Sequence, residues 1–432
     1  MSHATLRPGT AEQNPLLVTH LTAAKPVPPL PVDPALPQLA EVLNGQAMQV
    51  ALGDAGINDV EEARPRYVRY KPGNKAIVLY DVRLSGRRCV AVITASARRT
   101  LAKVCQRPDV RELADLVRQR TPGRTPMVFL NALSALVEWF PLNRLIPGLA
   151  LSSACLAGRL PRSDRQSAMV AEPFPLTYKP ERRAVLGWGR FVVKAYARRS
   201  DFDQAVHGFA AAKGAPGLTV PPLVAVLPES MVTLQMSVAG TRPDDSRTEE
   251  LGRALAKLHA AAVNSPFRTT PEDHLAAATE TCHHVGFLRP ALRPELERLL
   301  GKLESERPEP CALVQCHGDF HADQALVSAQ QLALIDFDHA CASHPALDLA
   351  TFAAHLLDGT ETSLNSALAA LDELLRGYGG APRDLDWFLA VGILRRASLP
   401  FRSLAPDWPV RVAGLIRAAA AVVSSYRRME AL

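Results

Sequence analysis

The stretch that decides the fold is HGDFHADQALVSAQQLALIDFDHA, which runs from His317 to Ala340. Its apolar residues 332–335 are typical of a buried strand, yet acidic residues stand on both sides of them. Asp319 follows one apolar strand and Asp336 ends a later one, so we expect hairpin pairing to bring these two carboxylates together. Converging carboxylates repel one another unless a divalent cation or a transferable proton holds them. The stretch therefore predicts a chemical site beside a core strand.

An amide side chain, Gln324, follows Asp319 by one short loop. Both side chains can therefore face the same volume. Magnesium prefers oxygen ligands, and a carboxylate with a side-chain amide suits it when substrate phosphates complete the shell. Gln324 and Asp336 are accordingly the predicted metal ligands.

The composition limits the class of protein. A chain of 432 residues with 47% hydrophobic residues predicts two or three globular domains. The formal charge of +6 is mild, and no basic run with interleaved aromatic residues indicates a nucleic-acid partner. The seven cysteines are scattered without a CxxC pair, which favours reduced thiols in a cytoplasmic protein. No signal peptide and no membrane-spanning run is expected.

An internal repeat occupies the first half of the chain. LPQLA (36–40) matches IPGLA (146–150), RYKPGNKAIVLY (69–80) matches TYKPERRAVLGW (177–188), and ITASARR (93–99) matches VKAYARR (193–199). Each copy has the pattern of strands joined by polar or glycine-containing turns. A shared bias toward alanine and arginine is the alternative explanation.

A lysine distinguishes the two copies. Lys194 lies inside the apolar run FVVKAY, and the first copy has Thr94 at the matching place. A lysine in a central strand costs stability unless an anion meets it. We therefore expect Lys194 to meet a ligand and the first copy to be a scaffold without that charge. A lysine at a sheet edge that reaches solvent is the alternative.

Helical periodicity begins at about residue 247, where EELGRALAKLHAAAV places its leucines on one face, and it recurs to the end of the chain. The exception is the stretch 317–340, which has the pattern of short strands. The layout is a β-rich part followed by a mostly helical part with an embedded hairpin.

The opening stretch resembles a known catalytic pattern. Asp319, Gln324 five residues later and the strand end Ile335-Asp336-Phe337 resemble the catalytic aspartate, metal-binding amide and metal-binding aspartate of kinases. His-Gly-Asp is the form found in aminoglycoside phosphotransferases and choline-kinase-like enzymes. The stretches VTLQMSVAG (232–240), LGRALAKLH (251–259) and ASHPALDLA (342–350) also resemble that family, so the resemblance covers residues 172–432.

The resemblance implies an α+β, protein-kinase-like fold of two lobes, and an ATP- and Mg2+-dependent transfer of phosphate to a hydroxyl of a small molecule. The acceptor class it implies is an aminoglycoside, a sugar or an amino alcohol. The expected regions are a proline-rich arm (1–32), an N-terminal domain with a partial repeat of the small-lobe hairpin (33–171), a nucleotide-binding small lobe (172–240) and a helical large lobe that binds the acceptor (241–432). The oligomeric state stays open.

The family pattern also assigns roles to single residues. Asp319 is the expected catalytic residue, and Gln324 and Asp336 hold Mg2+, or Mn2+, on the phosphates of ATP. His317 and Asp348 are expected to brace the catalytic loop. The residues expected to bind the nucleotide lie on the small lobe and its connection: Lys194, Arg182, Arg183, Gln235, Met236 and Ser237.

Two departures from the family pattern leave alternatives open. Gln324 stands where asparagine is usual, and the segment after Lys194 (201–215) contains no glutamate to pair with it. Either a shorter acid reaches Lys194 or the lysine relies on nucleotide phosphates alone. A non-catalytic nucleotide-binding or regulatory protein on the same scaffold is the second hypothesis. The role of Asp338 also stays open: it is either an ordinary loop residue or a minor metal or substrate ligand.

Overall fold

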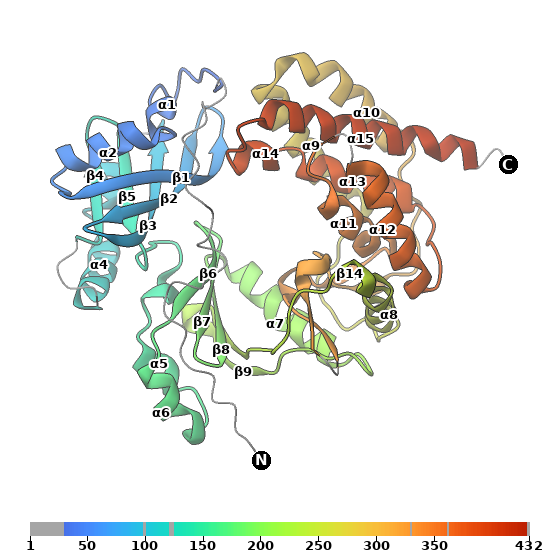
Figure 1. Cartoon of the computed structure of the whole chain (residues 1–432), viewed down its shortest axis with the longest axis horizontal. Helices are drawn as coiled ribbons and strands as arrows, with labels where there is room; N and C mark the ends of the chain where they lie inside the picture. The colour runs from blue at the N-terminus through green and yellow to red at the C-terminus, as the bar shows by residue number, and fades with distance from the viewer. Residues whose placement is uncertain (1–29, 98–100, 121–124, 329–330, 361–362, 430–432) are drawn as a thin grey trace.

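The computed structural model describes residues 30–97, 101–120, 125–328, 331–360 and 363–429. Two β-sheets lie on one side of the molecule and a helical lobe lies on the other (Figure 1). The arm expected over residues 1–32 falls almost entirely outside the described residues.

The first sheet is antiparallel and has the strand order β1-β2-β3-β5-β4. Helices precede it and connect its third and fourth strands. The elements are α1 (Leu39–Val42), α2 (Gly45–Asp54), β1 (Val60–Lys71), β2 (Lys75–Leu84), β3 (Arg87–Ser96), α3 (Leu101–Val104), α4 (Pro108–Arg120), β4 (Met127–Leu130) and β5 (Ala135–Trp139).

The second sheet repeats this topology, with the order β6-β7-β8-β10-β9 and one helix between its third and fourth strands. The similarity between the two copies therefore extends beyond the predicted hairpin, because the strand order of the whole five-stranded sheet recurs. The elements are α5 (Ser153–Ala157), α6 (Arg162–Val170), β6 (Phe174–Lys179), β7 (Arg183–Trp188), β8 (Phe191–Tyr196), α7 (Arg199–Lys213), β9 (Leu223–Leu227) and β10 (Val232–Met236).

The strand registers confirm that the two copies match residue by residue. Thr94 pairs with Ile77, and Lys194 pairs with Val185, which is the residue that matches Ile77 in the repeat. The first turns match as well, because Gly73 and Glu181 hold equivalent places and both have positive φ (68° and 55°). The left-handed conformation comes easily to glycine and is uncommon for glutamate, so Glu181 needs support from its surroundings.

The large lobe is mostly helical, as expected, and its apolar faces form one continuous core. None of the helices that the structure describes is long and apolar enough to cross a membrane. The helices are α8 (Thr248–His259), α9 (Pro271–Leu288), α10 (Arg293–Ser305), α11 (Ala346–Leu356), α12 (Ser363–Tyr378), α13 (Leu385–Arg396), α14 (Leu399–Arg402) and α15 (Trp408–Met429). The short strands are β11 (Val314–Cys316), β12 (Ala325–Val327), β13 (Leu332–Leu334) and β14 (Cys341–Ser343).

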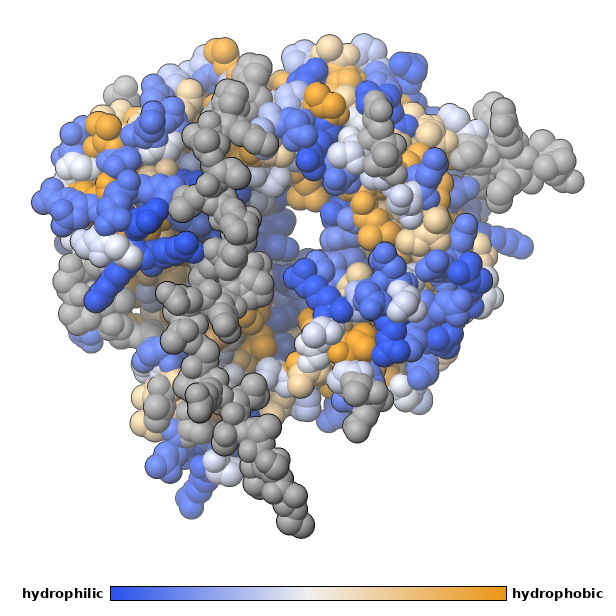
Figure 2. All heavy atoms as spheres, viewed as in Figure 1, coloured by the Kyte–Doolittle hydropathy of each residue, from blue (hydrophilic) through white to orange (hydrophobic). Residues whose placement is uncertain are grey.

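The first sheet contacts both the second sheet and the large lobe. Tyr70 at the end of β1 is 4% exposed and lies against Phe287 and Phe401 of the large lobe, with ring centroids 6.1 and 6.2 Å apart. Tyr178 of β6 packs against the face of the first sheet that carries Ile77, Leu79 and Val92. The three parts therefore surround a central opening, which the space-filling view shows passing through the molecule (Figure 2).

Candidate active site

The stretch from His317 to Ala340 folds as a loop, a hairpin and a short helix. Ala325 pairs with Leu334 in the β12–β13 hairpin, and this pairing returns Asp336 to the end of the loop that carries Gln324. A 3-10 helix, η7 (Phe337–His339), follows Asp336. Asp336 has a φ of 64°, the left-handed conformation that is uncommon outside glycine. Such a conformation persists where the surrounding structure holds it, and here it aims the carboxylate at the small lobe.

Lys194 lies between two carboxylates. Its Nζ is 2.5 Å from Asp336 Oδ1 and 2.6 Å from Asp338 Oδ1. The side chains of Lys194 and Asp338 are 4% and 3% exposed, so both charges are out of water and depend on each other. Tyr196, two residues further along β8, donates to Asp338 Oδ1 at 3.1 Å. The sequence left open whether a shorter acid or only nucleotide phosphates would meet Lys194. In the structure two aspartates reach it, and both come from the η7 region.

Arg183 binds the same two acids from β7. Its two terminal nitrogens donate to both oxygens of Asp336, at 3.2 and 3.0 Å, and Nη1 also donates to Asp338 Oδ2. Burial opposes ionisation of Asp336, but the charges of Lys194 and Arg183 hold its pKa well below the usual range. Burial likewise opposes the charge on Arg183, and the two aspartates outweigh it and raise its pKa.

Gln324 is buried at the end of the 3-10 helix η6 (Ala322–Gln324). Its amide nitrogen is 3.4 Å from Asp336 Oδ2 and 3.1 Å from Nε2 of His321. Burial and the neighbouring His355 lower the pKa of His321 to about 3, so its ring is neutral and Nε2 can accept this bond. The amide nitrogen, rather than the oxygen, therefore faces Asp336.

Asp319 lies on the loop after β11 and contacts a histidine of α11. Its Oδ1 is 3.5 Å from Nε2 of His355, and the rings of His355 and His321 stack with centroids 3.8 Å apart. Burial alone would raise the pKa of Asp319, but the bond with His355 and the neighbouring imidazoles of His339 and His321 lower it. The carboxyl is therefore an anion, as a proton acceptor must be.

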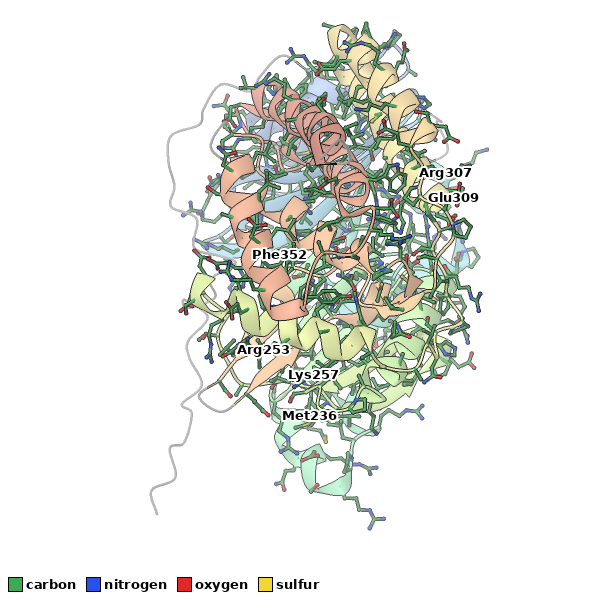
Figure 3. The ribbon with its side chains drawn as sticks, turned by 90° about the vertical axis from the view of Figure 1, so that its right-hand side faces the viewer. Met236, Arg253, Lys257, Arg307, Glu309 and Phe352 are labelled. Carbon is green, nitrogen blue, oxygen red and sulfur yellow. The ribbon has the colours of Figure 1, made fainter. Side chains whose placement is uncertain are left out.

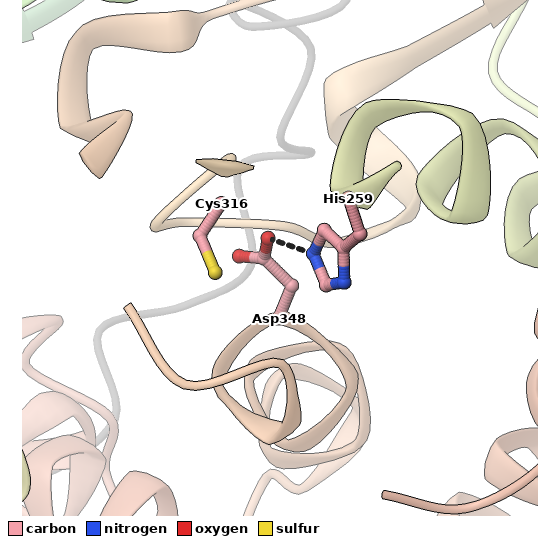
Figure 4. A group of neighbouring side chains, drawn as sticks. All are labelled: His259, Cys316 and Asp348. Carbon is pink, nitrogen blue, oxygen red and sulfur yellow. Dashed lines mark hydrogen bonds and ion pairs between the residues drawn. The ribbon is translucent and has the colours of Figure 1, made fainter. Parts of the chain in front are cut away.

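Asp348 braces the catalytic loop from below (Figure 4). Its Oδ2 accepts from the backbone N–H of His317 at 2.7 Å and its Oδ1 from that of Gly318 at 2.8 Å, while His259 Nε2 lies 3.0 Å from Oδ2. Cys316 completes a buried group that could hold a metal by its geometry. Burial and the neighbouring Asp348, however, raise the pKa of the thiol well above its usual value, so the group is better suited to support than to metal binding.

At two positions in this region the backbone of another segment comes so close that only glycine fits. Gly318 has a φ of 81°, and a Cβ there would lie 1.9 Å from the carbonyl oxygen of His339. Gly208 of α7 would place a Cβ 2.2 Å from the carbonyl oxygen of Phe337. These two glycines let the catalytic loop and α7 close on η7.

The ring of His317 contacts the backbone beside Asp336. Its Nε2 lies 2.9 Å from the carbonyl oxygen of Ile335, which ties the loop to the end of the β12–β13 hairpin. Among the residues that the structure describes, the histidines 317, 321 and 339 do not form one metal cluster. The group that does gather at the loop is Asp319, His321 and His355, whose ligand atoms lie within 4.8 Å of one another.

The connecting segment lies at the end of β10, below α8 in the side view with its labelled Arg253 and Lys257 (Figure 3). The backbone N–H of Met236 donates to Pro222 and that of Ser237 donates to Arg190, both at 2.9 Å. Gln235 is 3% exposed, and its amide nitrogen has no partner. The N–H groups of Met236 and Ser237 are thus engaged within the small lobe.

Arg182 is separated from the acids that Arg183 contacts. It is exposed on the β6–β7 turn, and the charges of Arg69 and Arg402 act on it. Side chains of adjacent residues at the end of a strand point to opposite sides of the sheet. Arg182 and Arg183, which were expected to act together, therefore lie in different surroundings.

Several residues of the site were not predicted from the sequence. His355 lies seven residues after Asp348, so helical spacing places both on one face of α11. Tyr196 had no such signal, because its role depends on how the small lobe meets η7. Asp338, which the sequence left open between a loop residue and a ligand, contacts Lys194 and Arg183. Lys179 also lies near Asp319 and Asp336, where burial and the charge of Arg183 lower its pKa.

Comparison with known proteins finds a matching family. Residues 178–388 match the phosphotransferase enzyme family, which supports a small-molecule phosphotransferase. The fold is the protein-kinase-like fold that the sequence predicted. No curated protein matches the chain.

Solved structures with partial likeness are of the same kind. A choline/ethanolamine kinase family protein from Mesorhizobium loti is 19% identical, with 58% of this chain and 87% of that chain covered and a TM-score of 0.43. An aminoglycoside phosphotransferase from Streptomyces rimosus is 19% identical, with 57% and 99% covered and a TM-score of 0.38. A choline kinase from Cryptosporidium parvum is 10% identical, with 63% and 96% covered and a TM-score of 0.45.

Proposed function

We propose that the protein transfers the γ-phosphoryl group of ATP, with Mg2+, to a hydroxyl group of a small molecule. The observation that supports this most directly is the meeting of Lys194, Arg183 and Gln324 at Asp336, one loop away from Asp319. Cations for phosphates, oxygen ligands for a metal and a carboxylate for a proton are the parts that phosphoryl transfer uses. In this proposal residues 172–240 bind the nucleotide and residues 241–432 bind the acceptor.

The donor set fits a magnesium ion. Asp336 and Asp338 offer hard carboxylate oxygens, and Gln324 offers an amide oxygen once its side chain turns over. When bound, Mg2+ would neutralise the charge that develops on the transferred group. Lys194 and Arg183 would then move part of their interaction from the carboxylates to the nucleotide phosphates, which also need cationic partners.

The proposed step conserves atoms and charge. Asp319 accepts the proton of the acceptor hydroxyl while the hydroxyl oxygen forms its bond to the γ-phosphorus. The bond between that phosphorus and the bridging oxygen of ADP breaks, and ADP keeps the electron pair. Because the pKa of Asp319 is lowered, its main contribution is to orient the hydroxyl and to take the proton late in the step.

One observation favours the second candidate, a nucleotide-binding protein without catalysis. Arg183 covers both oxygens of Asp336, the expected metal ligand. If this contact persists when nucleotide binds, Asp336 cannot hold a metal. The protein would then bind a nucleotide through cations alone.

The experiment that separates the two candidates measures ADP release with ATP and Mg2+ against a panel of sugars, aminoglycosides, amino alcohols and sugar phosphates. Catalysis predicts release that depends on both the acceptor and the metal and that Asp319→Asn abolishes. Nucleotide binding with no acceptor-dependent ADP release across the panel, under either Mg2+ or Mn2+, would favour the non-catalytic candidate.

A further inference from the structure

Three parts of the chain meet at Tyr67 on β1. Arg402 of α14 donates to its hydroxyl, and the guanidinium carbon lies 5.1 Å from the centre of its ring. Tyr178 of β6 packs on the same face of the first sheet as Tyr67. The N-terminal domain, the small lobe and the large lobe therefore share one junction beside the central opening (Figures 1 and 2).

Three arginines, one from each part, gather at this junction. Arg69 lies two residues after Tyr67 and so points to the same face of β1. Arg182 lies on the turn that follows Tyr178, and Lys75 of the first sheet holds that turn through Glu181 at 2.6 Å. The charges of Arg69 and Arg402 both act on Arg182. We call Arg69, Arg182 and Arg402 the arginine triad.

The triad is short of counter-charge, because Asp201 acts electrostatically on Arg182 without forming an ion pair with it. Among the residues that the structure describes, none of its members takes part in an ion pair, whereas Arg66 and Arg83 of the same sheet pair with Asp81 and Glu62. The Nε of Arg402 is buried without a hydrogen-bond partner. Gathered cations repel one another, and a buried donor without a hydrogen-bond partner lowers stability. An anion would relieve both costs.

We propose that the arginine triad binds an anionic group, a phosphate or a carboxylate, on the acceptor molecule. The proposal rests on the phosphotransferase function above and narrows its acceptor class to anionic hydroxy compounds such as sugar phosphates or sugar acids. Guanidinium groups suit it because their planar forks match phosphate and carboxylate oxygens. The N-terminal domain then supplies a substrate-binding residue, Arg69.

The acceptor, rather than the nucleotide, is favoured by where the cations lie. Lys194 and Arg183 already mark the phosphate end of the nucleotide at Asp336. Arg402 comes from the large lobe, six residues after Arg396, and Asp319 acts electrostatically on Arg396 and on its neighbour Arg395. The segment 395–402 therefore leads from the proposed base to the triad, along the side where an acceptor would lie.

The first experiment measures anion binding without turnover. Inorganic phosphate is titrated into the full chain saturated with Mg2+ and a non-hydrolysable ATP analogue, and heat or thermal stability is recorded. We expect phosphate to bind beside the nucleotide, and Arg69→Gln and Arg402→Gln to weaken it about tenfold or more, as loss of a charge-assisted hydrogen bond implies. Arg64→Gln, an exposed arginine of the same strand, removes the same charge and should leave phosphate affinity unchanged.

Two results of this titration would overturn the proposal. If the ATP analogue competes with phosphate for binding, the triad belongs to the nucleotide site. Equal losses in Arg64→Gln and Arg69→Gln would mean that only net charge matters. Arg402→Lys guards against a folding defect, because it keeps the charge and should retain more affinity than Arg402→Gln.

The second experiment compares acceptors in pairs that differ only by the anionic group, such as a hexose with its 6-phosphate and an alditol with the aldonate. We expect the anionic member to have the higher kcat/KM, by about tenfold or more, and Arg69→Gln to remove the difference by raising its KM. Turnover with neutral acceptors only would overturn the inference while leaving the proposed function intact. Metal and nucleotide binding without any turnover would instead overturn the proposed function, and the phosphate titration would still test the triad.

Discussion

Glu181, on the turn between the first two strands of the small lobe, accepts a hydrogen bond from Lys75 of the N-terminal sheet, with 2.6 Å between Nζ and Oε2. Arg144 holds its other oxygen at 3.0 Å and also pairs with the buried Glu138. The glutamate side chain is 4% exposed and its backbone is left-handed. The N-terminal domain thus supports a strained turn that contains Arg182 and is followed directly by Arg183.

We predict that Lys75→Ala raises the KM for ATP several-fold with a smaller change in kcat, because the turn loses part of its support while the reacting groups stay in place. Arg144 still holds Glu181, so the fold should persist. The control is Lys71→Ala, an exposed lysine at the end of β1. Equal KM values for wild type and Lys75→Ala, measured by initial rates, would mean that the turn needs no support from the first sheet.

Lys194→Met should raise the KM for ATP by about tenfold or more, since a charge-assisted contact to phosphate is lost. Thr94→Lys is the formal exchange in the other copy, but Thr94 is 1% exposed and a lysine there would disrupt the core. Thr94→Val is the better control, because the threonine hydroxyl has no hydrogen-bond partner and valine has its shape. A rise in the KM for ATP in Thr94→Val, with none in Lys194→Met, would show that the first copy binds the nucleotide and that our assignment is wrong.

Asp319→Asn should keep nucleotide binding and lower turnover by about two to four orders of magnitude, the range expected when proton transfer is lost. Calorimetry with an ATP analogue and a steady-state assay measure the two effects separately. Wild-type turnover in this variant would remove Asp319 from the mechanism.

The pH dependence of kcat/KM should report the contact between Asp319 and His355. The folded protein lowers the pKa of Asp319, so the base is ionised above that pKa and activity is lost only as the pH falls through it. His355→Gln removes a contact that lowers the pKa of Asp319 while burial remains, so the acid limb should move to higher pH. His283→Ala, on an exposed part of α9, is the control. An acid limb that stays in place would show that His355 does not act on the base.

Local sequence was sufficient for the elements and for the repeat. Alternation and turn residues identify the hairpins in both copies, and the spacing from Asp319 to Asp336 implies the loop and hairpin that join them. The matching stretches of sequence do not reach β4 and β5 or β9 and β10, so the common strand order of the two sheets could be recognised only in the structure.

Contacts between distant segments could not be read from the chain. Arg183 meets Asp336 across 153 positions and Arg402 meets Tyr67 across 335, and neither pair has a local pattern. The segment after β8 offers no glutamate partner for Lys194, and in the structure Asp338 of η7 contacts this lysine. Packing of the lobes decides these contacts, and packing depends on the whole chain.

The metal preference should depend on Gln324. Its amide nitrogen now lies 3.4 Å from Asp336 Oδ2, so the amide must turn over before its oxygen can share a metal with that carboxylate, and the bond to His321 must break. Magnesium demands near-ideal octahedral geometry at short distances, and larger divalent ions tolerate looser shells. We therefore expect the wild-type protein to use Mn2+ at least as well as Mg2+. Gln324→Asn should keep substantial activity with a changed metal preference, because its shorter amide cannot reach both His321 and the metal.

Gln324→Ala tests whether the amide is a ligand at all. It should raise the metal concentration needed for half-maximal activity sharply, since the carboxylates would hold the ion without the amide oxygen. The measurement is a titration of Mg2+ and Mn2+ at saturating ATP for wild type, Gln324→Asn and Gln324→Ala. Asp323→Asn, an exposed neighbour on the same loop, controls for general loop damage. If wild type and Gln324→Ala require the same metal concentration, Gln324 serves only to hold His321 and the loop, and Asp336 binds the ion without it.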